Sequence, residues 1–346
     1  MNSDADKTWE RAIGKLRRKK GYGPLTPEEA EAAYEAAPAV PLSAARISEI
    51  VKFATDAQEP VTAKPRTLIE WSRRFPLKAM KKFQFTLAEG VSDANALLDF
   101  FGVPSPDAWQ SKWDAQPVAF RQTQVFDARK EAVSAWVREA EIEASKLKLA
   151  DFDEARLRSS LEQLRRLTRK KVGEALEEAI AICSRAGVAL VLVPELPLTR
   201  ISGCARWLNE KHALIGLTIR YKTDDQFWFT FFHEVAHILL HRGLQTFVID
   251  NAAKEMGDEV VDPKMVKYEE EADRFSADTL ISPKALAEFL GRHGKTLTND
   301  EIHDFAEAIG IGPGIVIGRL QHVKVLEHWQ GNDLKQNLEW GFAPED

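Results

Sequence analysis

The sequence of 346 residues predicts an α+β fold that is mostly helical, with a small antiparallel sheet packed on one apolar helix. Three observations lead to this prediction. Residues 66–172 carry many helix signals and almost no strand signals. At Gly187 the pattern changes to short, valine-rich apolar runs bounded by Gly and Pro, which are typical of buried strands. These runs precede residues 226–241, QFWFTFFHEVAHILLH, whose apolar content all round predicts a buried helix.

The N-terminal part is expected to be helical throughout. Residues 1–60 are predicted to form an N-terminal helical segment, because Thr26 is a suitable cap and a proline and acidic residues follow it in the first turn. Residues 61–150 are predicted to form a helical domain, in which Ser92 is a plausible N-cap and Gly102 lies just past the end of the same helix.

Residues 151–282 are predicted to form the domain that carries the chemistry. Three strand-like runs lie close together at 187–196, 202–208 and 213–219, and their short connections indicate a small antiparallel sheet. Asp224 and its neighbour cap the apolar helix. The residues from Gly243 to about Lys267 are loop-like and acidic, and a further helix ends before Pro283. Residues 283–346 are expected to be a C-terminal helical hairpin and tail.

Composition excludes several classes of protein. With 44% hydrophobic and 29% charged residues the chain is neither disordered nor of low complexity. No apolar run approaches the roughly 20 residues that span a bilayer. The N-terminal basic run lacks the apolar stretch of a secretory signal. Two cysteines, Cys183 and Cys204, fit a reducing compartment, so we expect a cytoplasmic protein. A net charge of −6 argues against duplex DNA binding by the whole surface.

All the histidines lie in the C-terminal part of the sequence, and histidine is the commonest metal ligand and neutral-pH acid or base. They are His212, His233, His237, His241, His293, His303, His322 and His328. His233 and His237 form an H-E-x-x-H pattern on the apolar helix, so their side chains share one face and can reach one metal. Two histidines buried there without a partner would be costly. Zinc is the metal that this pattern suits, and Glu234 is the expected general base.

The third ligand is expected from the helix that follows. Glu269 and Asp273 share one helix face, so Glu269 can bind the metal while Asp273 orients an imidazole from behind. Glu270 is the next candidate, because three consecutive acids cannot all face one ion. His241 lies near the end of the apolar helix, where a capping or helix-dipole role is the better interpretation.

These residues carry a family resemblance. FFHEVAHILLH, followed some 30 residues later by EEEADRFSADTLISP, resembles the ImmA/IrrE family of gluzincin-type metallo-endopeptidases. The family pattern E-x-x-A-N-x-F-A maps its first Glu, a metal ligand, onto Glu269, and Asp273 stands where Asn is common. The stretches FPLKAMKKF, LLDFFGVPSPDAW, SGCARWL and GIGPGIVIGRLQH resemble a long branch of HigA-like regulators. That branch begins with a helix-turn-helix domain, for which residues 1–60 show no convincing pattern.

The resemblance implies a zinc endopeptidase that cuts a partner protein. Characterised members of the family cleave a helix-turn-helix transcriptional repressor and thereby derepress stress, mobile-element or phage-defence genes. One alternative is a DNA-binding transcriptional regulator or antitoxin whose peptidase-like domain binds a partner without cutting it. Another is a metal-dependent hydrolase of small amides.

Three weaker signals complete the sequence-based expectations. Cys204 lies on a strand before the apolar helix, where a thiolate could reach the zinc and inhibit the enzyme. Tyr221 is a candidate oxyanion donor, chosen by residue type only. The same holds for Arg206, Arg220, Tyr268 and His303. Two basic clusters, at 17–20 and 165–171, could dock a nucleic-acid activator, although a solvated helix face is the simpler interpretation.

Overall fold

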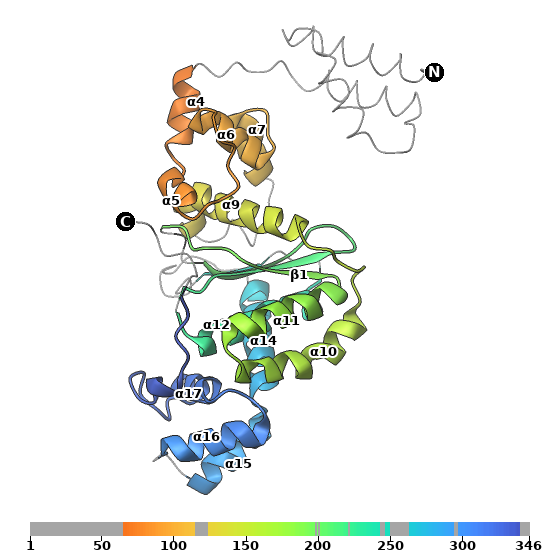
Figure 1. The fold of residues 1–346 in the computed structure, drawn as a ribbon, viewed down its shortest axis with the longest axis vertical. Helices are drawn as coiled ribbons and strands as arrows, with labels where there is room; N and C mark the ends of the chain where they lie inside the picture. Colours follow the sequence, from red (N-terminus) through yellow and green to blue (C-terminus); the bar gives the residue numbers. More distant parts are fainter. Residues whose placement is uncertain are drawn as a thin grey trace. The chain divides into compact units, whose positions relative to one another are not determined.

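A four-stranded mixed sheet lies between two groups of helices in this computed structural model of the chain (Figure 1). The structure describes residues 65–114, 124–197, 199, 201–220, 222–242, 246–249, 263–293 and 297–339. The helical segment expected at 1–60 lies outside these residues. Within them the α+β class is confirmed.

The sheet has the order β1-β3-β2-β4, with β1 parallel to β3 and β2 antiparallel to both of its neighbours. Its strands are β1 (Val188–Leu192), β2 (Ile201–Trp207), β3 (Ala213–Leu217) and β4 (Thr246–Ile249). The predicted purely antiparallel sheet is therefore wrong for one pair. A tight turn, in which Leu208 N–H donates to the His212 carbonyl, returns β3 alongside β2. Because β1 and β2 run in opposite directions, the inserted β3 is parallel to β1.

The fourth strand is absent from the sequence-based prediction. β4 lies within the stretch from Gly243 to Lys267 that was expected to be loop-like, and it pairs with β2 in the register Cys204↔Phe247. Its sequence, TFVI, has the β-branched and aromatic residues that favour a strand, but it is short and acidic residues follow it.

In chain order, the described helices up to α9 form a first group, and those from α10 onward form a second. The first group is α4 (Pro65–Ser72), α5 (Leu77–Lys82), α6 (Asp93–Phe101), α7 (Pro106–Asp114) and α9 (Gln124–Ser145). The second is α10 (Glu154–Arg166), α11 (Val172–Arg185), α12 (Asp224–Leu240), α14 (Pro263–Leu280), α15 (Pro283–His293), α16 (Asn299–Ile309) and α17 (Pro313–His322). Ser92 caps α6 and Gly102 ends it in the left-handed conformation, as predicted.

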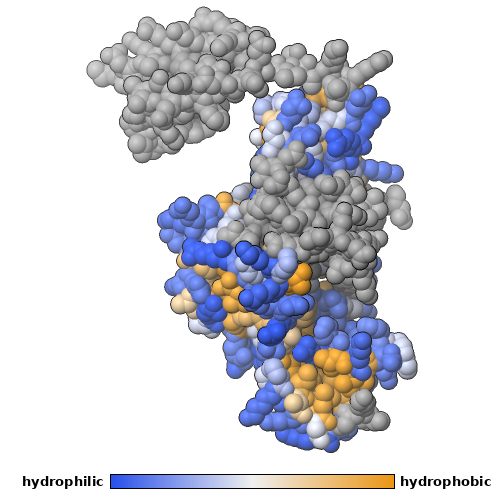
Figure 2. Space-filling model, turned by 180° about the vertical axis from the view of Figure 1, so that it is seen from behind, coloured by the Kyte–Doolittle hydropathy of each residue, from blue (hydrophilic) through white to orange (hydrophobic). Residues whose placement is uncertain are grey.

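Each face of the sheet carries its own hydrophobic cluster, because side chains alternate along a strand. On β1, Ala189 and Val191 belong to the cluster under α9, whereas Val188 and Leu190 belong to the cluster that contains α11 and α12. Figure 1 shows α9 on one side of the sheet and α11, α12 and α14 on the other. The C-terminal helices extend the second cluster, and apolar side chains gather over them on the face that Figure 2 shows. Consequently α12 is buried along nearly its whole length.

The start of α12 is fixed by the C-terminal residues of the described chain. Asp224 N–H donates to the Gln336 carbonyl, and Gln336 N–H donates to Asp224 Oδ1, both at 3.0 Å. Lys335 Nζ lies 2.8 Å from Asp225 Oδ2, and both side chains are buried. Gly318 of α17 packs so closely here that a Cβ would lie 2.5 Å from Asp225 Oδ2. The apolar helix thus begins in a buried socket that contains the Asp225–Lys335 ion pair and is formed by Asp224, Asp225, Gly318, Lys335 and Gln336.

This socket predicts a large loss of stability for Lys335→Met. The substitution leaves the buried Asp225 carboxylate without its cation, and breaking a buried pair in this way costs about 3–5 kcal/mol. The free energy of unfolding from urea titration measures the effect. Lys284→Met, at a lysine whose side chain is 87% exposed, is the matched control and should change stability little. The double variant Asp225→Asn/Lys335→Met should recover part of the loss; a single variant as stable as the control would contradict the assignment.

Candidate metal centre

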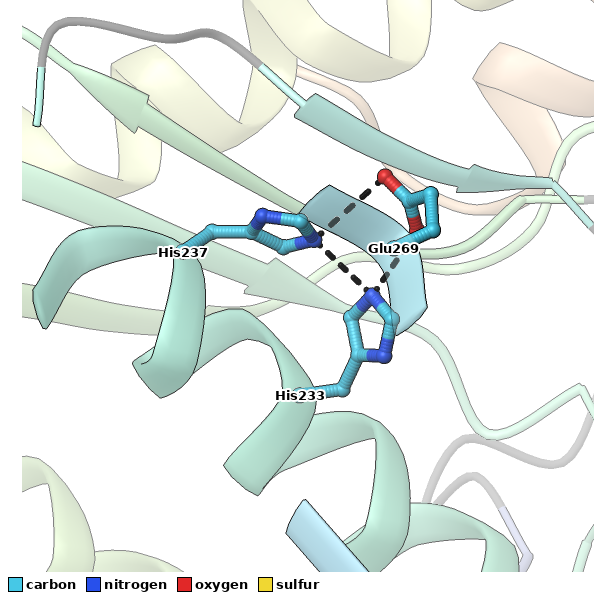
Figure 3. Close-up of side chains that lie close together, drawn as sticks. All are labelled: His233, His237 and Glu269. Atoms are coloured by element: carbon cyan, nitrogen blue, oxygen red, sulfur yellow. Dashed lines mark hydrogen bonds and ion pairs between the residues drawn. The ribbon is translucent and has the colours of Figure 1, made fainter. Parts of the chain in front are cut away.

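Two histidines of α12 and one glutamate of α14 converge on a single point (Figure 3). His233 and His237 are each 3% exposed. Their Nε2 atoms lie 2.9 Å apart. Glu269 Oε2 lies 3.1 Å from His233 Nε2, and Glu269 Oε1 lies 3.5 Å from His237 Nε2. The two H-E-x-x-H histidines share one face of α12, as expected, and they meet Glu269. Glu270, the next candidate, is exposed.

The spacing and chemistry of these donors fit a divalent metal. A tetrahedral zinc ion with bonds of about 2.0–2.1 Å holds its ligand atoms roughly 3.3 Å from one another. The three separations of 2.9, 3.1 and 3.5 Å bracket that value. Two imidazoles and one carboxylate also form the donor set of catalytic zinc sites, which keep one further position open.

The electrostatics of the cluster hold Glu269 in the form that binds metal. Burial raises the pKa of its carboxyl, but the hydrogen bonds with His233 and His237 outweigh burial and bring that pKa to about 2. Burial lowers the pKa of His237. It also opposes charge on His233, but the Asp273 and Glu269 carboxylates prevail and raise the pKa of His233 to about 10. Glu269 is therefore ionised, which is the form of the carboxyl that binds a metal ion.

Glu234 lies against Gly203 of β2 and is fully buried. Neither of its carboxyl oxygens has a hydrogen-bond partner in the described part of the chain. Burial raises its pKa well above the usual range, although the neighbouring His233 lowers it. The carboxyl fits only because β2 has Gly203 opposite: a Cβ there would lie 2.7 Å from Glu234 Oε1. An unpartnered buried carboxyl of this kind is suited to exchange a proton with a molecule bound at the cluster.

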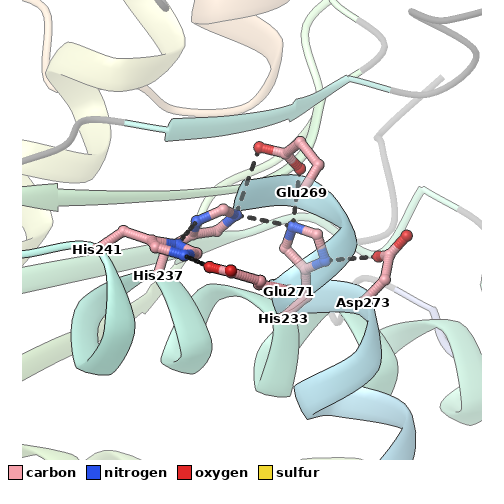
Figure 4. A network of polar contacts seen from close by, with 6 residues as sticks. All are labelled: His233, His237, His241, Glu269, Glu271 and Asp273. Carbon is pink, nitrogen blue, oxygen red and sulfur yellow. Dashed lines mark hydrogen bonds and ion pairs between the residues drawn. The ribbon is translucent and has the colours of Figure 1, made fainter. Parts of the chain in front are cut away.

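A second layer of polar contacts lies behind the histidines (Figure 4). Asp273 Oδ1 accepts from His233 Nδ1 at 2.8 Å, which is the contact expected of Asp273. On the other side, His241 Nδ1 lies 3.0 Å from His237 Nδ1, and His241 Nε2 lies 3.0 Å from Glu271 Oε2. Sequence reasoning favoured a capping or helix-dipole role for His241 and considered Glu271 only as one of three consecutive acids that could supply the third ligand. The spacing of His241 four residues after His237 was the signal available for it.

Cys204 does not reach the cluster, so the expected thiol switch is not supported. It follows Gly203 on β2 and therefore faces the opposite side of the sheet, in the cluster under α9. Its Sγ would lie 3.1 Å from a Cβ at Gly216, whose other neighbours there are Trp136 and Ala140 of α9. Burial raises the pKa of the thiol well above its usual range, which disfavours a thiolate. Tyr221, the candidate oxyanion donor, lies outside the described residues.

Three of the other candidate donors have packing or pairing partners. Arg206 pairs with Glu141 on the α9 side of the sheet, Arg220 pairs with Glu195, and the Tyr268 ring lies 4.5 Å from the His241 ring. His303 is exposed on α16.

Two arginines of the basic cluster at 165–171 make contacts within the fold. Arg165 donates to the carbonyls of Leu280 and Ile309 and so caps the ends of α14 and α16. Arg166 pairs with Glu162 at 3.0 Å. The cluster at 17–20 lies outside the described residues.

Comparison with known proteins gives one match. Residues 200–321 match the family model of the IrrE N-terminal-like domain, Peptidase_M78. No curated protein and no solved structure matches the chain. Among the described residues, no helix has both the length and the apolar content to cross a membrane. The matched segment contains His233, Glu234, His237 and Glu269, and it runs from β2 to α17. Residues 200–321 thus resemble the Peptidase_M78 family, in agreement with the resemblance of the sequence to the ImmA/IrrE metallopeptidases.

Proposed function

We propose that this protein is a zinc-dependent endopeptidase. The observation that carries the proposal is the convergence of two imidazoles and one carboxylate beside a second, buried carboxyl that has no hydrogen-bond partner among the described residues. His233, His237 and Glu269 would hold the ion. Zinc bound by such a set supplies Lewis acidity, which makes water a usable nucleophile near neutral pH.

Glu234 is proposed as the general base and acid. One of its carboxylate oxygens takes a proton from the attacking water, and the same carboxyl then delivers a proton to the amide nitrogen that leaves. Complete burial suits this task, because it keeps the proton affinity of the carboxyl high. Gly203 on β2 leaves the space in which the carboxyl can sit without a hydrogen bond to the protein.

The substrate is proposed to be a protein, and by resemblance a helix-turn-helix transcriptional repressor in the cytoplasm. Its cleavage would derepress stress or phage-defence genes, and a nucleic acid could act as activator. The matched family supports a peptidase, whereas the partner and the genes rest on the resemblance alone.

Metal content is the first test of this proposal. Purified protein should contain about one zinc per chain by elemental analysis, because three ligands complete a catalytic site. His233→Ala and Glu269→Ala should each lose the metal, whereas Glu270→Ala, at the exposed neighbouring carboxylate, should keep it. Zinc kept by Glu269→Ala would assign the third ligand elsewhere. Wild-type protein that takes up no zinc would remove the basis of the proposal.

Glu234→Gln separates proton transfer from metal binding. The variant should keep its zinc and lose cleavage activity by about 10²–10⁴-fold, since the amide cannot accept a proton. Mass spectrometry of repressors encoded beside the gene, incubated with each protein, detects the new N-terminus. A repressor that binds wild-type protein and stays intact would favour the non-cleaving regulator.

Gly203→Ala tests the space around the general base. The added methyl would lie 2.7 Å from Glu234 Oε1 and 2.8 Å from Thr230 Cγ2, so either the carboxyl or the strand must move. We expect cleavage to fall at least tenfold while zinc is retained, together with a stability loss of about 1–3 kcal/mol from overpacking. Gly291→Ala in α15, where a Cβ meets open space, is the matched control. Equal activity in the two variants would contradict this account of Gly203.

A further inference from the structure

We propose that His241 and Glu271 are positioning residues for His237, acting through a chain of hydrogen bonds that runs His237–His241–Glu271. The inference rests on the proposed function, because it concerns how the metal-binding form of His237 is selected. The contacts that define the chain are His237 Nδ1 to His241 Nδ1 and His241 Nε2 to Glu271 Oε2, each 3.0 Å long (Figure 4).

Only one placement of the ring protons fits this chain of hydrogen bonds when His237 binds a metal ion. The Nε2 atom of His237 must offer its lone pair at the cluster, so the ring proton is on Nδ1. That N–H faces His241 Nδ1, which must accept and therefore carries no proton. His241 then has its proton on Nε2 and donates it to the Glu271 carboxylate. Every contact then pairs one donor with one acceptor.

The competing arrangement excludes metal. If His241 carried protons on both nitrogens, its Nδ1–H would face His237 Nδ1, which would have to accept. The proton of His237 would then be on Nε2, at the atom that must bind the ion. The Glu271 carboxylate would accept from His241 Nε2 in either arrangement, so it is acceptance of the His237 Nδ1–H by His241 Nδ1 that leaves His237 Nε2 free to bind a metal ion.

The surroundings of His241 hold its ring for this task. Its side chain is 2% exposed, and the Tyr268 ring packs against it at 4.5 Å between centroids. The Glu271 carboxylate contacts both His241, through Oε2 at 3.0 Å from Nε2, and the Lys267 ammonium, through Oε1 at 3.6 Å from Nζ. The role of His241 at the end of α12 is separate, because it uses the backbone: His241 N–H donates to the His237 carbonyl. A helix end needs no buried imidazole with both nitrogens engaged.

The two metal-binding histidines are thus supported in different ways. The Nδ1 atom of His233 contacts a carboxylate, Asp273, directly, whereas the Nδ1 atom of His237 is linked to a carboxylate, Glu271, through a second imidazole. Ligand histidines in proteins commonly donate their second N–H to such an acceptor, and loss of the acceptor weakens metal binding about 10–100-fold. His241 and Glu271 extend that support outward by one residue.

The test compares metal affinity in four variants of the full chain. Glu271→Gln keeps an acceptor oxygen and loses the charge, and Glu270→Gln makes the same charge change at the exposed neighbour. His241→Phe keeps a ring against Tyr268 and removes both nitrogens. His241→Asn returns an acceptor near the position of Nδ1. Zinc affinity is measured by competition with a chromophoric chelator, the ligand field by the visible spectrum of the Co²⁺ form, and folding by the melting temperature of metal-free protein.

We expect His241→Phe to bind zinc about 10–100-fold more weakly and to alter the Co²⁺ spectrum, with partial recovery of both in His241→Asn. Glu271→Gln should fall between wild type and His241→Phe, and Glu270→Gln should match wild type. Should His241→Phe fail to fold, the partly exposed Glu271 still gives the comparison with Glu270. Equal affinities and spectra for Glu271→Gln and Glu270→Gln would overturn the inference while wild-type zinc binding upheld the proposed function. Wild-type protein without metal affinity would overturn both.

Discussion

The pairing of α12 with α14 is the interaction on which the site and its surroundings depend. α12 is buried on every side, yet it carries three histidines and a glutamate over its last three turns and its cap. Buried polar groups need partners, and an apolar neighbour would supply none. For the three histidines, though not for Glu234, α14 meets this demand with three carboxylates at alternate positions, Glu269, Glu271 and Asp273. Ser276 adds a hydrogen bond from its hydroxyl to the Phe229 carbonyl at 2.8 Å, which fixes how the two helices align.

The far end of α12 depends on residues that are distant in the sequence. α17 and the residues around Lys335 close over Asp224 and Asp225, roughly two turns before His233. The matched family domain ends at residue 321, within α17, so it includes the helix that covers this socket. The C-terminal helices thus belong to the machinery that holds the H-E-x-x-H helix in place, although they supply no ligand atom to the described cluster.

The sequence predicted which side chains of the two helices lie together better than it predicted which strands pair, and the reason is the range of the interactions. His233, His237 and Asp273 follow from helical periodicity, which is local, and Glu269 needed only one helix to face another. The parallel β1–β3 pair and the strand β4 depend on which segments meet across the fold, and no periodicity records that. Cys204 shows the same limit. Neighbouring residues of a strand face opposite sides of a sheet, so a shift of one residue would exchange them. Gly203 occupies the face toward Glu234, and Cys204 occupies the opposite face.

The burial of Glu234 without a hydrogen-bond partner among the described residues has a consequence for how this chain evolves. A buried carboxyl without a partner destabilises the folded protein, and an apolar residue of similar size would relieve that burden. Most random substitutions at such a position would therefore be favoured by folding and opposed only by loss of chemistry. Under the proposed function, a lineage without peptidase activity would be expected to lose this glutamate early, well before the histidines that the carboxylates of α14 hold in place. The identity of the residue at position 234 is thus a sensitive record of whether selection still acts on catalysis.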